Sequence, residues 1–294
     1  MEIIKLIRVK HWVKNSFMFI PLFFAGKLSD FSLYPSLILG FFSFSFVASS
    51  IYVINDWKDI EADRLHPKKK KRPLASGKVS IPMAWVTFFV LLAGGLGLAA
   101  YVDMKFAFVM LIYFLMNVAY TLGLKKVSIL DIVIVAIGFV LRVKSGGIIT
   151  DIALSQWIVV MVFLLALFMA IAKRRDDLVI KGDSGIDLRA VTKTYSLDFL
   201  NISLSLVAGV IFVSYLMYCM SPNVVERMGT YRLYYTALFV LAGIMRYLQL
   251  ALVENNTGSP TKVLYKDRFI QVVLALWVLS FYLLIYFKDV SIFS

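Results

Sequence analysis

The chain has 294 residues, of which 61% are hydrophobic and 17% charged, and its 31 Lys and Arg against 18 Asp and Glu give a formal net charge of +13. Soluble domains carry about 45–50% apolar and about 25% charged residues, and a single core stops growing near about 250–300 residues. This composition therefore excludes an ordinary soluble domain, a disordered chain and, with Cys219 as the single cysteine, a disulfide scaffold.

Apolar runs long enough to cross a bilayer recur along the chain. A transmembrane helix needs about 20 predominantly apolar residues. Eight runs meet this requirement, at residues 33–54, 81–101, 104–124, 127–149, 154–172, 197–220, 231–253 and 269–287. They predict an all-α, polytopic membrane bundle.

A ninth and shorter apolar stretch, Ser16–Ala25, follows a group of cationic residues and is interrupted by Pro21. A signal peptide has the same order of charge and apolar run, but no small-x-small cleavage site follows here. We interpret the stretch as a retained span that packs against protein rather than lipid. The sequence then predicts nine transmembrane helices in one integral-membrane domain covering residues 1–294.

The positive charge is distributed unevenly between the segments that join these spans. With nine spans, 24 of the 31 Lys and Arg fall on the side of the N-terminus. The positive-inside rule then predicts a cytoplasmic N-terminus and an external C-terminus. We expect the membrane to be a bacterial-type cytoplasmic membrane. The same distribution favours membrane lipids over nucleic acid as a partner of this charge, and it leaves formation of a homo-oligomer open.

Carboxylates gather in the two longest connections on that side, residues 55–80 and 173–196, which we predict to be cytoplasmic active-site loops. If the preceding helix continues outward, Asn55, Asp59 and Asp63 share one face at i, i+4 and i+8, with Asp56 one position round. Spacing alone leaves two interpretations open: a solvated helix end paired with lysines, or a divalent-metal site. Oxygen ligands of this kind would select Mg²⁺, usually shared with substrate phosphates.

A strongly basic segment, Lys68–Arg72, follows directly after these carboxylates. A juxtamembrane basic loop ordinarily orients the chain and binds anionic lipid heads. Beside a carboxylate cluster, lysine and arginine are also what a phosphorylated substrate requires.

Two further edges on the same side combine acids and cations. Tyr120 and Lys125 precede Asp131, and the run Lys173–Asp177 opens the later loop. Three such edges predict the rim of one polar cavity. Arg142, inside an apolar span, is a further candidate because intramembrane charges usually face a bundle interior or a watery cavity.

The segment Asn55–Asp63 has the form N-D-x-x-D-x-x-x-D, which resembles the first signature of the UbiA superfamily of intramembrane prenyltransferases. Arg8–Asn15 resembles the R-x-K-x-W-V-K-N opening of one branch, the decaprenyl-phosphate phosphoribosyltransferases, and Arg72–Gly77 resembles its R-P-[IL]-A-[AS]-G stretch. Such matches extend over essentially the whole chain. One departure is the second motif, Lys173–Asp177, which is more basic than in prenyl-diphosphate enzymes and has Asp177 where Glu is expected.

The resemblance implies a Mg²⁺-dependent transferase that moves a 5-phosphoribosyl group from phosphoribosyl diphosphate to a polyprenyl phosphate. It implies catalytic roles for Asn55, Asp56, Asp59 and Asp63, of which Asn55, Asp59 and Asp63 would be Mg²⁺ ligands. The predicted substrate-binding residues are Lys14, Lys69, Arg72, Tyr120, Lys125, Asp131, Arg142, Lys173, Arg174 and Asp177. Two alternatives remain: a prenyltransferase acting on an aromatic acceptor, and a lipid-binding or transport protein without enzymatic activity.

Overall fold

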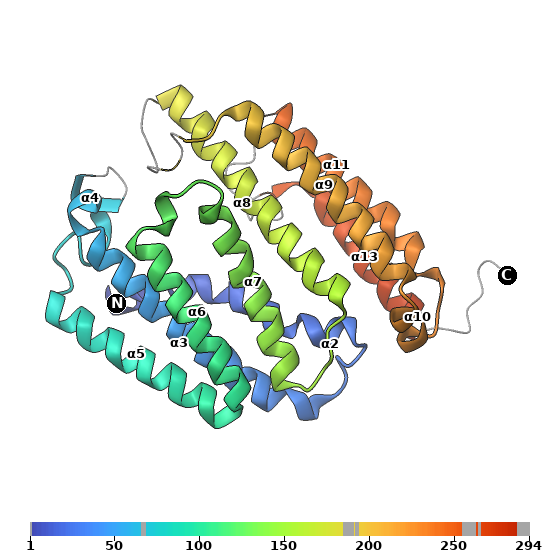
Figure 1. Cartoon of the computed structure of the whole chain (residues 1–294), viewed down its shortest axis with the longest axis horizontal. Helices are drawn as coiled ribbons and strands as arrows, with labels where there is room; N and C mark the ends of the chain where they lie inside the picture. Colours follow the sequence, from blue (N-terminus) through green and yellow to red (C-terminus); the bar gives the residue numbers. More distant parts are fainter. Residues whose placement is uncertain are drawn as a thin grey trace. The chain divides into compact units, whose positions relative to one another are not determined.

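The structure is a computed structural model that describes residues 2–65, 69–184, 191, 194–254, 263 and 266–286. These residues form α-helices and short 3-10 helices without a strand (Figure 1), which confirms the predicted all-α class. Their helices of sixteen residues or more are α3 (Tyr34–Lys58), α5 (Ile81–Val102), α6 (Met104–Leu122), α7 (Leu130–Ile149), α8 (Gln156–Ser184), α9 (Leu197–Met220), α11 (Ala237–Leu252) and α13 (Arg268–Tyr286).

Every one of the eight clear apolar runs coincides with one of these helices. Within the described residues, seven helices are long and apolar enough to cross a membrane, and Arg268–Leu284 is a shorter apolar helix. The ninth predicted span, Ser16–Ala25, is divided between a 3-10 helix, η1 (Val9–Phe19), and the five-residue helix α2 (Ile20–Phe24). The predicted count of nine spans is therefore not confirmed.

The chain divides into two compact units. The first contains residues 1–125 and 138–154, and the second contains residues 126–137 and 155–294, so that α7 contributes to both. The prediction of a single domain stays a prediction.

Helix α3 is the centre of the first unit. Two of its buried serines donate hydrogen bonds to neighbouring segments: Ser43 to the carbonyl of Gly95 in α5, at 2.8 Å, and Ser49 to the carbonyl of Ile7, at 2.8 Å. Because serine is small, the backbones approach closely here, and a Cβ at Gly95 would lie 3.1 Å from the Ser43 carbonyl oxygen. Serine and glycine thus let α3 and α5 pack at short distance.

The N-terminal segment η1 packs against α3 and the second half of α7. Asn15 donates to Ser45 of α3 at 2.9 Å, and Trp12 donates to Ser49 at 3.0 Å. A Cβ at Gly146 of α7 would lie 1.9 Å from the carbonyl oxygen of Met18. The segment is therefore held inside the first unit by polar contacts and by backbone contact.

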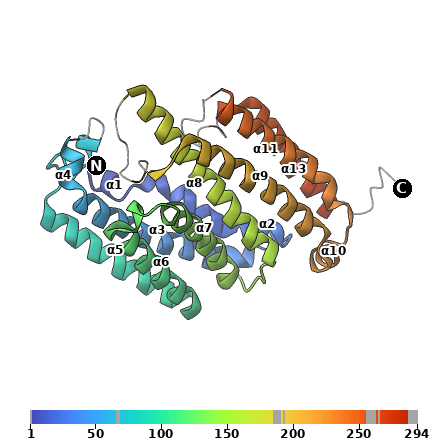
Figure 2. The ribbon, with the colours of Figure 1, turned by 45° about the horizontal axis from the view of Figure 1, so that its top comes forward.

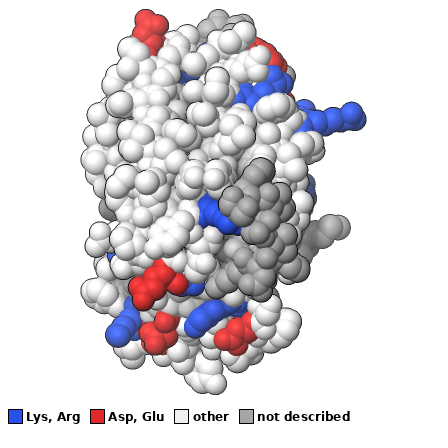
Figure 3. Space-filling model, turned by 90° about the vertical axis from the view of Figure 1, so that its right-hand side faces the viewer, with Lys and Arg blue, Asp and Glu red and all other residues white. Residues whose placement is uncertain are grey.

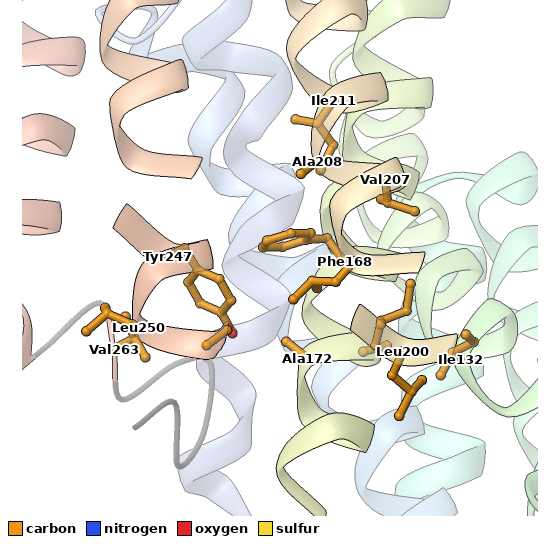
Figure 4. Close-up of a cluster of buried hydrophobic side chains, with 14 of the residues drawn as sticks. Ile132, Phe168, Ala172, Leu200, Val207, Ala208, Ile211, Tyr247, Leu250 and Val263 are labelled. Atoms are coloured by element: carbon orange, nitrogen blue, oxygen red, sulfur yellow. The ribbon is translucent and has the colours of Figure 1, made fainter. Parts of the chain in front are cut away.

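In the second unit, α9, α11 and α13 run side by side (Figures 1 and 2). Helix α8 packs along α9, and a hydrophobic cluster between the helices includes Phe168 and Tyr247, whose ring centroids are 5.0 Å apart. Figure 4 shows these two rings with Leu200, Val207 and other members of the cluster. The core of this unit thus combines residues from α8, α9 and α11.

The outer surface is largely apolar. Phe89 of α5 and Phe108 of α6 are 61% and 64% exposed. On the face drawn in Figure 3, uncharged side chains form broad areas between small groups of charged ones. Exposing such a surface to lipid hydrocarbon has no free-energy cost, whereas exposing it to water is unfavourable.

Candidate active site

The signature Asn55–Asp63 lies where α3 ends. Helix α3 stops at Lys58, and α4 (Ile60–Leu65) begins one residue after Asp59. The Asp59 amide nevertheless donates to the Asn55 carbonyl at 3.1 Å, and the Asp63 amide donates to the Asp59 carbonyl at 2.8 Å. Helical spacing thus continues through the one-residue interruption, as the sequence predicted.

Asn55 and Asp59 converge on the ammonium group of Lys125, which follows α6. The Lys125 Nζ lies 2.9 Å from each carboxylate oxygen of Asp59 and 3.4 Å from the Asn55 Oδ1. Both members of the ion pair are partly exposed. Three side-chain oxygens therefore point toward one position that carries positive charge.

Asp56 and Asp63 instead share the guanidinium group of Arg72. The Arg72 Nη1 donates to Asp63 at 2.6 Å and to Asp56 at 3.0 Å. Both carboxylates are buried, at 2% and 3% exposure, and the burial of a carboxylate is costly unless a cation pairs with it. The predicted trio of Asn55, Asp59 and Asp63 thus does not surround a single atom in this structure.

Arg8 is a second partner of Asp56 that the sequence analysis did not select. It donates to Asp56 through Nη2, and its guanidinium carbon lies 4.6 Å from the centroid of the Tyr52 ring. Its backbone is left-handed, with φ of 52°, which is uncommon for a residue other than glycine. The motif Arg8–Asn15 is the feature of the sequence that points to this residue.

The amide and carboxylate oxygens of this site are suitable ligands for a hard divalent cation. The described residues contain no group of three or more His, Cys, Asp and Glu that could hold a metal. Mg²⁺ needs less than that, since it usually takes one or two carboxylates and completes its shell with water and substrate phosphates. The amide and carboxylate oxygens of Asn55 and Asp59 already converge on one cation, and this arrangement suits such a partial ligand set.

Among the predicted residues of the second unit, Asp131, Arg174 and Asp177 form a charged group. Arg174 of α8 donates through Nε to Asp131 of α7 at 2.5 Å, and its Nη1 lies 3.6 Å from Asp177. Asp131 is fully buried and also accepts a hydrogen bond at 2.6 Å from Tyr195, which the sequence analysis did not identify. Burial raises the pKa of Tyr195, and its bond to Asp131 acts in the same direction.

Helix α8 differs from the prediction that a loop begins at residue 173. It runs on to Ser184, so Lys173, Arg174 and Asp177 are helical residues. Arg174 and Asp177 are buried, whereas Lys173 is exposed. The spacing of three residues brings Arg174 and Asp177 to the same face.

Arg142 is enclosed within the first unit. Its guanidinium donates to Asn15 at 2.9 Å, to the Tyr113 hydroxyl at 2.9 Å and to the Gly138 carbonyl at 2.7 Å. Its guanidinium carbon also lies 4.8 Å from the centroid of the Phe44 ring. These contacts hold η1, α3 and α6 around one cation inside a membrane-spanning segment.

The remaining predicted residues occupy different places. Lys14 is exposed in η1, Tyr120 is half-buried in the last turn of α6, and Lys69 is half-buried at the start of the short helix η3 (Lys69–Lys71). Lys68 of the basic segment lies outside the described residues. That all these residues line one cavity stays a prediction.

Comparison with known proteins identifies relatives for nearly the whole chain. The model of the UbiA prenyltransferase family matches residues 16–273. Decaprenyl-phosphate phosphoribosyltransferase of Mycolicibacterium smegmatis is 31% identical, covering 97% of this chain and 93% of the relative. The enzyme of the same name from Corynebacterium glutamicum is 30% identical, with 96% and 86% covered.

A similar fold is known from a UbiA homologue of Archaeoglobus fulgidus that was solved with DMAPP and Mg²⁺. The TM-score is 0.71, and the match covers 97% of this chain and 99% of that chain at 19% identity. With the apolar helices described above, these matches indicate an integral, multi-pass membrane protein.

Proposed function

The chain belongs to the UbiA prenyltransferase family, and from this premise we propose that it transfers the 5-phosphoribosyl group of phosphoribosyl diphosphate to a polyprenyl phosphate, with release of diphosphate. Two relatives named decaprenyl-phosphate phosphoribosyltransferase match this chain at similar sequence identity, and the matches cover most of their length. The observation that carries the proposal is the convergence of the Asn55 and Asp59 oxygens on the ammonium group of Lys125, while Arg72 binds the carboxylate of Asp63.

Asn55, Asp59 and Asp63 would hold Mg²⁺ against the diphosphate of the donor. When bound, the metal would supply neutralisation of the charge that develops on the leaving diphosphate. Mg²⁺ is bound together with DMAPP in the archaeal UbiA homologue, which supports this assignment by analogy of fold. Asp56 would act on the site through the arginines that it holds, Arg8 and Arg72.

Lys125 and Arg72 occupy positions where they balance the carboxylates in the absence of ligand. A phosphate group offers each cation a stronger, doubly anionic partner. We expect them to exchange carboxylate contacts for phosphate contacts when the donor binds, and this exchange leaves carboxylate oxygens for the metal. Each cation thus has one role without substrate and another with it.

Basic residues would bind the phosphates that distinguish this donor from a prenyl diphosphate. We assign Lys69, Lys173 and Arg174, with Lys14, to the ribose 5-phosphate and the lipid phosphate. Tyr120 would contact the substrates, and Asp131, Asp177 and Arg142 would orient neighbouring groups, because each contacts side chains of its own unit.

Attack by the lipid phosphate on C1 of the ribose would form the new C–O bond as the bond to diphosphate breaks. A phosphate monoester is anionic near neutral pH, so the step needs no strong general base. Positioning by the arginines and lysines, together with electrostatic stabilisation of an oxocarbenium-like state, would provide most of the rate enhancement. The polyprenyl tail would lie against the apolar helices.

The distribution of Lys and Arg supports an orientation with the N-terminus in the cytoplasm. In this orientation the signature Asn55–Asp63 would lie at the cytoplasmic face, where a soluble, charged donor is accessible. A bacterial-type cytoplasmic membrane is the location that we propose.

A radiolabel assay tests the proposal. Membranes containing the protein are incubated with Mg²⁺, polyprenyl phosphate and phosphoribosyl diphosphate labelled in the ribose, and the lipids are extracted. We expect label in a lipid product that contains ribose phosphate. Label that enters lipid only from a prenyl diphosphate would support the second candidate, prenyl transfer to an aromatic acceptor, which the DMAPP-bound structural relative favours. Transfer from neither donor would favour a lipid-binding or transport protein.

A further inference from the structure

The hydroxyl of Tyr195 bridges two residues at the start of α7. It accepts a hydrogen bond at 2.7 Å from the backbone N–H of Ile129 and donates one at 2.6 Å to Asp131. Tyr195 is 7% exposed, and its ring stacks on Phe199 with centroids 5.9 Å apart. A single buried hydroxyl group therefore joins the backbone of the turn to the carboxylate two residues further on.

Ile129 has a backbone conformation that its side chain disfavours. Its φ is 68°, in the left-handed region, where a β-branched residue is a genuine outlier. Its side chain is 54% exposed, so packing of that side chain does not hold the conformation in place. Strained residues of this kind persist only where surrounding contacts determine them.

The strained residue also lies directly before α7. The Ile129 carbonyl accepts hydrogen bonds from the amides of Ile132, at 3.1 Å, and Val133, at 3.0 Å. The orientation of its peptide groups consequently sets the first turn of α7, which contains Asp131. Asp131 in turn holds the Nε of Arg174.

We propose that Tyr195 is a positioning residue whose hydroxyl holds the turn at residues 127–131 in the conformation that presents Asp131 to Arg174. Without the hydroxyl, the Ile129 N–H loses its acceptor and the left-handed conformation loses the contact that maintains it. Asp131, fully buried, loses one of its donors at the same time. The effect on catalysis rests on the proposed function, because it treats Arg174 as a phosphate-binding group.

The test combines Tyr195→Phe, which removes only the hydroxyl, with Ile129→Gly. Glycine adopts a left-handed conformation without steric cost, so it removes the need for a hydrogen bond to maintain the turn. The matched control is Asp151→Gly, because Asp151 is also an exposed non-glycine residue with positive φ, at 51°, but belongs to the first unit. Hydrogen exchange of a peptide spanning the turn and KM for the donor are measured in all variants.

We expect Tyr195→Phe to increase exchange in the turn and KM for the donor by about tenfold each, the change that loss of one hydrogen bond produces. We expect kcat to change much less. Adding Ile129→Gly to Tyr195→Phe should reverse most of the increase in KM, whereas adding Asp151→Gly should reverse none of it.

Unchanged exchange in Tyr195→Phe, or equal rescue by the two glycine substitutions, would overturn the proposal. The exchange measurement needs no substrate, so it decides whether Tyr195 holds the turn even if the wild-type protein proves inactive with phosphoribosyl diphosphate. In that case KM is measured with the prenyl diphosphate that the wild type accepts. Failure of the proposed function and failure of the role of Tyr195 thus give different results.

Discussion

The guanidinium group of Arg8, a residue with a left-handed backbone, donates a hydrogen bond to the carboxylate of Asp56, which is 2% exposed. Asp56 accepts a second hydrogen bond from Arg72, which also holds Asp63. Two arginines and two aspartates thus form an ion-pair network at the end of α3, in which the positive and negative charges are equal in number. The N-terminal segment contributes one of its four members, which makes this segment part of the candidate site.

Replacing Asp56 tests this ion-pair network. Asp56→Asn would leave two arginines facing the single carboxylate of Asp63, and breaking a buried ion pair costs about 3–5 kcal/mol. Because both arginines are partly exposed, we expect a smaller loss of about 2 kcal/mol, measured as a lower thermal unfolding temperature in detergent. Asp198→Asn, an exposed control at the start of α9, should leave the unfolding temperature within about 1 °C of wild type. Equal unfolding temperatures for the two variants would contradict the role of Asp56.

The metal assignment predicts that Asp59→Asn abolishes transfer. Since residues outside the metal shell typically contribute 10–100-fold, loss of a ligand should reduce the rate by about 100-fold or more. The activity is measured as label transferred to lipid over a range of Mg²⁺ concentrations. Glu61→Gln is the matched control, because Glu61 is a carboxylate of α4 with a side chain that is 84% exposed. Retained activity in Asp59→Asn would refute the assignment.

Lys125 contacts the signature through a hydrogen bond to Asp59, and the next residue in the sequence is also a lysine, Lys126. Lys125→Met should increase KM for the donor by about tenfold or more, because it removes a charge-assisted phosphate contact. Its effect on thermal stability should be at most about 1 kcal/mol, as for other partly exposed ion pairs. Lys126→Met, at an exposed position, should leave KM unchanged. A similar KM for both variants would show that the ammonium of Lys125 does not bind the donor.

Asp267 provides a prediction about pH. The hydrogen bond from Arg246 lowers the pKa of Asp267 below its usual value of about 3.9. The pair therefore contributes stability above that value and loses it as the pH falls through the lowered pKa. We expect Asp267→Asn to unfold at a lower temperature than wild type at pH 7, with the difference shrinking as the pH falls below about 4. A difference that stays constant with pH would contradict this role of the pair.

Much of the fold followed from hydrophobic length alone. All eight clear apolar runs are helices, because about 20 apolar residues leave few alternatives in a membrane. The segment Ser16–Ala25 was harder to predict, since its place depends on tertiary contacts such as Asn15 with Ser45. Hydropathy does not record such contacts.

The candidate site was predictable in part. The spacing of Asn55, Asp59 and Asp63 correctly indicated continued helical geometry, because hydrogen bonds from i+4 to i persist through the break. The spacing did not indicate that Arg72 takes Asp63 while Lys125 takes Asp59, because these partners come from other elements. Tyr195 gave no signal in the sequence, since its role depends on the backbone conformation of Ile129.

The close approach of Gly146 to Met18 has a consequence for how this protein can vary. A side chain at Gly146 would enter the space of the Met18 carbonyl, so any enlargement of α7 there must be accompanied by a shift of the whole η1 segment. Arg8 immediately precedes that segment. Substitutions in the interior of α7 and at the charged end of α3 are therefore expected to be interdependent, and a change tolerated in one relative would be harmful when transferred alone into another.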